Sequence, residues 1–433
     1  MKSTIKYLGG FLSAAIVLGG LASCQKMDYP DRFTATEGLP SVDYVRYAAQ
    51  DVFISQAFMD EVLCVVGDNL RSVHDVLFND QKAILNTSYI TDHTLIVSVP
   101  STPAKVTTNC MYLVTAKQDT VKYDFKILPP IPKVTSMTNE WAKEGEEVTL
   151  YGRYFIGVTG IDLPGASVTD FTVNSSESIT FKIPAGASAG PVTVTTESGS
   201  ANSVFQFMDS RNMLFDFDGL RGGMATGNGW RAPAKGHLHN DGDDAFAGID
   251  GAYLWLGGAS NGLKADATGV WAEDEYSFDY WNSTDVNSAI PPLKSLSTFS
   301  NYLDKYGIAG LTLKFECMVP TSNPWKTCSM QLMFSDSKTV NADAGTNNYF
   351  SDENFPRALW TPWLVGGSYD TGDKWVTVSI PLTEFVYTHM GKSCSTTFDK
   401  SYLDGFTLFV WGGESGSDCD PVIAIDHIRV VPL

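Results

Sequence analysis

The chain has 433 residues and a formal net charge of −19, and its basic residues form no cluster or stripe. This length suits roughly two to four domains, and the acidic excess makes nucleic acids and anionic membrane surfaces poor partners. Apolar residues make up 43% of the chain, which argues against a disordered protein.

The N-terminus resembles a lipoprotein export signal. Lys2 and Lys6 precede an apolar run at 7–21, which is too short to span a bilayer comfortably, and the run leads into Leu-Ala-Ser-Cys. This resembles a bacterial lipobox, which implies that residues 1–23 are cleaved off and that Cys24 carries the lipid. Each methylene of the acyl chains that is buried in the bilayer stabilises the anchor by about 0.8 kcal/mol. An ordinary cleaved signal peptide with a cysteine nearby is the alternative. Residues 24–41 then provide the lipidated cysteine and a polar tether.

Six cysteines follow Cys24. An exported protein can pair them, although no short-spaced framework occurs and buried free thiols also behave as small apolar residues. Their pairing therefore stays open. The absence of a CxxC motif argues against a zinc site.

Beyond the tether the sequence predicts an all-β protein. Runs such as TLIVSVP (94–100) and SITFKIP (178–184) alternate apolar and polar residues, and Gly, Pro, Asn and Asp separate them. One short helix is predicted over 296–305. No apolar run after residue 21 is long enough for a transmembrane helix.

Two segments repeat each other at a spacing of about 84 residues. VLCVVGDNL, TLIVSVP and VKYDFKI in the first match VTLYGRYF, SITFKIP and NSVFQF in the second. Gly67 matches Gly152 and is expected to supply a positive-φ turn, while Leu70 matches Phe155 and is expected to plug the core. The units resemble IPT/TIG-type immunoglobulin-like sandwiches, which implies domain 1 at 42–128 and domain 2 at 129–208. Their expected role is to hold the rest of the chain away from the membrane.

The C-terminal domain, residues 209–433, begins with MLFDFDG (213–219) and ends with IAIDHIRVVPL (423–433). Both runs alternate, which is typical of the first and last strands of a jelly-roll-type sandwich that pair with each other. Nine of the ten tryptophans lie after residue 229. Trp375 is expected in the core, whereas Trp411 suits the core and the surface equally.

The stretch SFDYWNS (277–283) places two large rings side by side. On a strand, Phe278 and Tyr280 share one face while Asp279 and Trp281 share the other. One ring should therefore anchor the core while the other faces a ligand. A bulge that turns both rings outward is the alternative.

Several aromatic residues stand beside turn-forming residues, where a core has little use for them. Short acidic and amide side chains accompany them. Indole faces with such groups suit a pyranose, which has an apolar face and a hydroxylated rim. The candidate ligand-binding residues are Trp230, Trp271, Asp279, Tyr280, Trp281, Asn282, Trp325, Trp360 and Trp363.

A lipobox, Ig-like spacers and a tryptophan-rich C-terminal sandwich together resemble the surface glycan-binding proteins of Bacteroidetes. The motifs MLFDFDG, NGW, DYW, LKFECMVP, NPWKTCSMQLMF and RALWTPW carry the resemblance. It implies a monomeric, non-catalytic lipoprotein on the outer-membrane surface. Such a protein binds a β-glucan, either xyloglucan or mixed-linkage glucan, for a TonB-dependent importer. An insert at 237–262 departs from the family pattern and makes the register between Trp230 and Tyr280 uncertain.

Two other function classes compete with this interpretation. A surface glycoside hydrolase or lyase needs two positioned carboxylates, and a structural adhesin needs no such concentration of tryptophan at turns. No cofactor is expected. The run from His237 to Asp250 is rich in Asp but fails the EF-hand pattern, because Phe246 occupies the position that needs Gly; a structural calcium ion stays an alternative.

Overall fold

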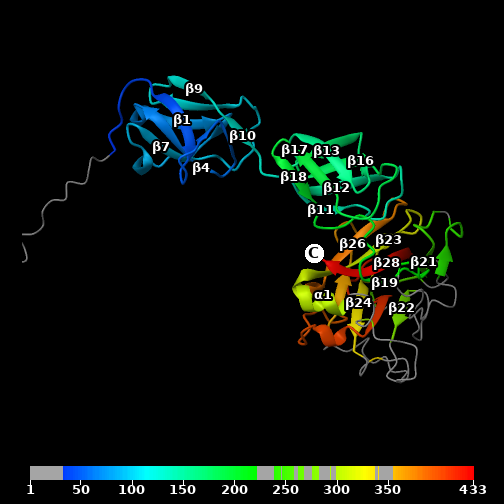
Figure 1. The fold of residues 1–433 in the computed structure, drawn as a ribbon. Helices are drawn as coiled ribbons and strands as arrows, with labels where there is room; N and C mark the ends of the chain where they lie inside the picture. Colours follow the sequence, from blue (N-terminus) through cyan, green and yellow to red (C-terminus); the bar gives the residue numbers. More distant parts are fainter. Residues whose placement is uncertain are drawn as a thin grey trace, which may run out of the picture. The chain divides into compact units, whose positions relative to one another are not determined.

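The computed structural model describes residues 33–221, 238–244, 246–257, 262–267, 276–281, 293, 299–336, 340 and 355–433. Within these ranges nearly all regular structure is β, which confirms the all-β prediction (Figure 1). No helix of the described ranges is long and apolar enough to cross a membrane. The chain divides into two compact units, residues 1–130 and 131–433.

The first unit contains domain 1. Its strands are β1 (Ser41–Tyr47), β2 (Phe53–Ile54), β3 (Gln56–Phe58), β4 (Val62–Asp68), β5 (Val73–Phe78), β6 (Gln81–Lys82), β7 (Thr94–Ser98), β8 (Cys110–Thr115), β9 (Thr120–Asp124) and β10 (Lys126–Leu128). They form the sheets β2-β1-β4-β7 and β6-β5-β8-β9 and a parallel pair, β10-β3. One apolar core that includes Val65, Leu95 and Leu113 lies between the two sheets.

Domain 2 is a second sandwich with its own core, which includes Leu150, Ile179 and Val194. Its strands are β11 (Lys133–Met137), β12 (Glu147–Arg153), β13 (Val158–Leu163), β14 (Ala166–Ser167), β15 (Phe171–Ser175), β16 (Ser178–Lys182), β17 (Thr193–Thr196) and β18 (Gly199–Asn202). They form the sheets β11-β12-β16-β15 and β14-β13-β17-β18.

The C-terminal domain packs two sheets around one large core. Sheet A contains β19 (Met213–Phe215), β20 (Leu238–Asn240), β21 (Ala252–Gly257), β23 (Leu311–Met318), β26 (Val376–Pro381) and β28 (Val422–Pro432). Sheet B contains β22 (Ser277–Tyr280), β24 (Met330–Ser335), β25 (Ala358–Trp360) and β27 (Gly405–Val410). Their orders are β20-β21-β28-β23-β26 and β22-β27-β24-β25.

In sheet A, β19 pairs antiparallel with β28, which confirms the predicted pairing of the domain's first and last strands. The helix α1 (Phe299–Tyr306) overlaps the helix predicted over 296–305. Short 3-10 turns lie at Leu70–Ser72, Thr87–Tyr89, Ile308–Gly310, Leu382–Glu384 and Lys400–Tyr402.

The glycines shared by the two repeats have a different role from the predicted one. Neither Gly67 nor Gly152 has a positive φ. Instead, each lies opposite a register shift in the neighbouring strand, where a Cβ would collide with the backbone oxygen of Ser41 or Lys133. Glycine is needed there for close approach of two backbones rather than for a turn.

The core residues predicted from the repeat are confirmed. Leu70 and Phe155 are buried in their respective cores.

The structure also resolves the pairing of the cysteines. All six cysteines after Cys24 are free thiols. Burial raises the pKa of Cys317, which therefore packs as a small apolar residue of the C-terminal core.

Candidate functional site

The side chains of β22 alternate between the two faces of sheet B. Phe278 and Tyr280 belong to the main core, whereas Asp279 and Trp281 lie on the outer face, which confirms the predicted alternation. However, the exposed fraction is 0% for Tyr280 and 2% for Trp281. Since β22 pairs with β27 without a register shift, no bulge turns both rings outward. The expectation that at least one ring of this pair faces solvent is therefore wrong.

Trp281 packs in a second, smaller apolar cluster that covers part of the outer face of sheet B. Its Nε1 donates to Thr407 Oγ1 at 3.2 Å, and Thr407 donates in turn to Asp279 Oδ1 at 2.9 Å. The other buried members of the cluster are Met333, Val340, Phe355 and Phe409. These contacts make Trp281 and Asp279 supports of the face rather than accessible groups on it.

Three more predicted rings gather at one end of the sandwich. Trp325 and Trp363 are buried, and their Nε1 groups donate to backbone carbonyls at 2.6 and 2.7 Å. Trp360 stands edge-on to Trp325, with ring centroids 5.5 Å apart, and edge-on to Tyr369 at 5.7 Å. Of the predicted tryptophans that the structure describes, Trp360 alone keeps a half-buried ring. The predicted Trp230, Trp271 and Asn282, and also Cys24 and His237, lie outside the described residues.

Trp411 marks the accessible end of the outer face of sheet B. Its half-buried indole lies nearly parallel to the imidazole of His389, at 9° and 5.9 Å between centroids. The Gln331 amide donates to the Trp411 backbone oxygen, and Gln331 Oε1 accepts from Arg357 at 2.6 Å. Gln331 and Arg357 are fully buried and His389 is 8% exposed, so the Trp411 ring is the accessible part of this group.

This face is elongated along β27. Tyr280 lies opposite Phe406, so Trp281 lies near one end of β27, whereas Trp411 follows its other end. At about 3.3 Å per residue their backbones are roughly 20 Å apart. Because Trp281 is buried, the accessible part of the face lies toward Trp411.

Sequence reasoning missed His389, Gln331 and Arg357. One signal was available for Gln331, which stands between Met330 and Leu332 in the run MQLMFS and breaks an otherwise apolar strand at the outward position. Arg357 and His389 lie outside regular strands, and they approach Gln331 through tertiary contacts alone. No local pattern marks them.

Trp375 was expected in the core, whereas the sequence left Trp411 open between core and surface. Trp375 is buried against Met318 and Tyr253, and its Nε1 donates to the backbone oxygen of Ala247 at 2.9 Å, as expected of a core residue. Trp411 is only half-buried. Burial thus resolves the ambiguity that the sequence left for Trp411 in favour of partial exposure.

The carboxylates between Asp241 and Asp250 do not converge on one point. Asp244 Oδ2 contacts His239 Nδ1 at 2.8 Å and accepts from the Tyr253 hydroxyl, and Asp241 accepts from the backbone N–H of Gly248. Asp250 contacts a different residue, His427. Existing hydrogen bonds thus account for these groups without a shared ion.

Among the described residues, Asp250, Asp426 and His427 are the group whose ligand atoms lie close enough, within 4.8 Å of one another, to hold a metal. Burial by itself would lower the pKa of His427, but Asp426, Asp250 and Glu316 raise it to about 9. Arg221 also pairs with Asp250, so this carboxylate already has a cationic partner. Because calcium prefers six to eight oxygen ligands, this arrangement favours internal ion pairs, and we assign no metal to it.

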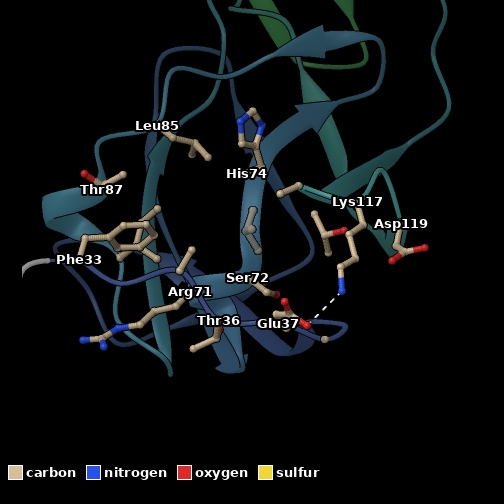
Figure 2. A pocket seen from close by; sticks show the side chains of 16 residues that line it. Phe33, Thr36, Glu37, Arg71, Ser72, His74, Leu85, Thr87, Lys117 and Asp119 are labelled. Atoms are coloured by element: carbon tan, nitrogen blue, oxygen red, sulfur yellow. Dashed lines mark hydrogen bonds and ion pairs between the residues drawn. The ribbon is translucent and has the colours of Figure 1, made fainter.

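Domain 1 contains a separate cavity of about 480 Å³ (Figure 2). Phe33 and Leu85 contribute apolar walls, and a 3.1 Å ion pair between Lys117 and Glu37 lies at its edge. Its lining contains no tryptophan or tyrosine. The cavity therefore lacks the large flat rings found in the C-terminal domain.

Comparison with known proteins identifies the family. The family described as the surface glycan-binding protein B xyloglucan binding domain matches residues 207–432. The chain belongs to this family. The match covers both sheets of the C-terminal domain, including the outer face of sheet B.

The chain is also similar to solved and curated proteins. The surface glycan-binding protein PbSGBP-B from Prevotella bryantii is 34% identical, with a TM-score of 0.75, and the match covers 92% of this chain and 99% of that one. An IPT/TIG domain-containing protein of Bacteroides ovatus is 26% identical over 272 residues, which are 61% of this chain and 46% of the relative. The chain thus matches about half the length of that curated relative. SGBP-B from a xyloglucan utilization locus of Bacteroides uniformis is 17% identical over 92% of this chain and all of that one, at a TM-score of 0.41.

Proposed function

We propose that this member of the surface glycan-binding protein B family captures a β-glucan, either xyloglucan or mixed-linkage glucan, without cleaving it. The family description names xyloglucan for the domain that matches residues 207–432. Flat β-linked glucans present extended faces, which suit an elongated aromatic surface better than coiled α-glucans do.

The observation that carries the proposal is the composition of the outer face of sheet B. Trp411 offers a half-buried ring stacked on His389, whereas Gln331 and Arg357 are fully buried and support this end of β27 through hydrogen bonds. A flat ring of this kind suits the apolar face of a pyranose. Covering one large ring with sugar is worth roughly 1.5–3 kcal/mol before ordering costs. Two or three rings then give dissociation constants of about micromolar to millimolar.

The ligand-binding roles predicted for Trp230, Trp271 and Asn282 belong to this proposal, as does that of Trp360. Trp230→Ala should weaken glycan binding about tenfold or more. Trp141, the one tryptophan in the sequence of the two Ig-like domains, is buried, so residues 25–208 should bind none.

We also propose that Cys24 carries a lipid that holds the protein at the outer-membrane surface, where it delivers glycan to a TonB-dependent importer. The lipobox-like Leu-Ala-Ser-Cys supports the anchor. In cells, Cys24→Ala should abolish acyl labelling and shift the protein out of the membrane fraction. Unchanged membrane association would contradict the lipobox.

The test of binding is a glycan panel with the mature chain. Affinity gel electrophoresis against xyloglucan, mixed-linkage β-glucan and an α-glucan should show retardation by a β-glucan alone. Chromatography of the same glycans after long incubation should show intact chains. Retardation by the α-glucan alone, or shortened products, would overturn the proposal.

A further inference from the structure

Domain 2 contacts the outer face of sheet A through a short turn, Asn139-Glu140-Trp141. The backbone N–H of Glu140 donates to Thr377 Oγ1 at 2.7 Å, and that of Thr377 donates to the Thr138 carbonyl at 2.8 Å. Glu140 and Trp141 are both buried, at 1% and 3% exposed. The turn is therefore inserted into the C-terminal domain rather than resting on its surface.

Charged groups of sheet A depend on this turn for their partners. Glu140 accepts from Lys314 Nζ at 2.5 Å and from Arg429 at 2.9 Å. Arg429 also donates to Glu316 at 2.7 and 3.1 Å, and Thr377 donates to Glu316 at 3.0 Å. Without Glu140, Lys314 would lose the carboxylate to which it donates, and Arg429 would lose one of its two hydrogen-bonded carboxylates.

Trp141 covers the neighbouring part of the same surface. Its ring stacks on His427, with centroids 3.9 Å apart, and the guanidinium of Arg221 lies 4.8 Å from its centroid. It belongs to an apolar cluster that includes Met213, Tyr253 and Trp375 of the C-terminal domain. The tryptophan of domain 2 thus completes an apolar cluster on the outer face of sheet A, separate from the core between the two sheets.

Domain 1 does not carry this turn. Val42 of β1 pairs with Gly67 and Val134 of β11 pairs with Gly152, so the two strands are equivalent. Glu140 and Trp141 then correspond to Ala48 and Ala49, which offer neither a carboxylate nor an indole. The two Ig-like domains share a fold but differ at the position that inserts into sheet A.

We propose that the outer face of sheet A is an obligatory docking surface for domain 2, so that domain 2 and the C-terminal domain fold as one cooperative unit. Domain 2 is then a structural part of the glycan-capture domain rather than an interchangeable spacer. Because sheets A and B enclose one core, docking on sheet A leaves the outer face of sheet B on the side of the sandwich opposite domain 2. This inference does not depend on which glycan is bound.

The test introduces one core defect into each Ig-like domain of the full chain. Leu150→Ala empties the core of domain 2, and Leu113→Ala is the matched defect in domain 1. Nine of the ten tryptophans lie in the C-terminal domain, so a tryptophan-fluorescence melt reports chiefly on that domain. Leu150→Ala should lower its midpoint by about 5–10 °C, whereas Leu113→Ala should change it by about 1 °C or less. Equal shifts, or no shift for Leu150→Ala when circular dichroism shows domain 2 lost, would overturn the proposal.

Glu140→Gln tests the same coupling without emptying a core, and Glu147→Gln is its control on an exposed carboxylate of domain 2. Hydrogen exchange of the full chain should quicken in β12 and β16 of domain 2 and also in β23 and β28 of sheet A for Glu140→Gln alone. Faster exchange confined to domain 2, or unchanged exchange, would contradict obligatory docking.

Discussion

The two outer faces of the C-terminal sandwich arise from the same alternation of strands but hold different side chains. That of sheet A carries Lys314, Glu316 and Arg429, and domain 2 buries them. That of sheet B carries Trp411 and Gln331 beside His389 and Arg357, and Trp411 stays partly open. Full charges suit a face that is closed once during folding, where each charge finds a permanent partner. The half-buried ring of Trp411 suits a face that a sugar covers and uncovers, because an apolar ring costs little to desolvate.

Removing the central cation of sheet A should have the largest effect. Arg429→Met leaves the buried carboxylates of Glu140 and Glu316 without their shared partner, and should reduce the free energy of unfolding by about 3–5 kcal/mol. Denaturant titration measures the loss, with Arg153→Met, an exposed site on β12, as the control. Glycan affinity of the folded variant should stay unchanged. A loss below about 1 kcal/mol would mean that the cluster stabilises little.

Trp281→Ala tests whether the outer face of sheet B depends on its buried ring. Since Trp281 packs among Met333 and Phe409, the substitution should destabilise the protein by roughly 3–5 kcal/mol, much as Trp375→Ala should on the other sheet. Thermal melts measure this. Normal stability with lost glycan binding would contradict this, because it would mean that Trp281 is accessible and contacts the glycan.

The charged face should make stability depend on pH. The pKa of His427 is raised from 6.5 to about 9 in the folded state, so its contribution is complete below about pH 6.5 and is lost as pH rises through 9. The loss should reach about 3 kcal/mol. His427→Asn, which tolerates the positive φ of this position, should flatten the dependence in urea titrations between pH 6 and 10. An unchanged profile in the variant would assign the dependence to other groups.

Glu316 should make the stability fall at low pH. Burial would raise its pKa, but Arg429 and His427 lower it below 4.5, so its stabilising contribution is present above that value and is lost as pH falls. Maximum stability is therefore expected between the low pH at which Glu316 is protonated and the high pH at which His427 loses its proton.

The smallest expected free-energy change compares the glycan affinity of one half-buried tryptophan from each sheet. Trp411→Ala on the outer face of sheet B should weaken β-glucan binding about tenfold, or about 1.4 kcal/mol, with little loss of stability. Trp255→Ala removes an equally half-buried indole from β21 of sheet A and should leave binding unchanged. Calorimetric titration of both variants measures the difference. Equal losses of affinity would place the glycan elsewhere.

Much of the architecture was predictable from local sequence. Alternation in the C-terminal run predicted both the strand β28 and its pairing with β19, and the repeat predicted the buried Leu70 and Phe155. For the candidate site the sequence predicted that Phe278 and Tyr280 share one face and Asp279 and Trp281 the other, and it left open which of Tyr280 and Trp281 anchors the core. It misjudged Gly67 and Gly152, because a close approach of two backbones and a positive-φ turn select the same residue.

The sequence by itself determined which residues share a face, since side chains on a strand alternate with a period of two. Only the tertiary structure decided what covers each face. Trp281 and Trp411 both stand on the outer face of sheet B, yet Val340 and Phe355 pack in the cluster that buries Trp281, whereas Trp411 stays half-buried. In the same way, nothing local to Arg429 indicates that Glu140, 289 positions away, completes its ion pairs. Burial depends on contacts between distant segments, and strand periodicity carries no information about those contacts.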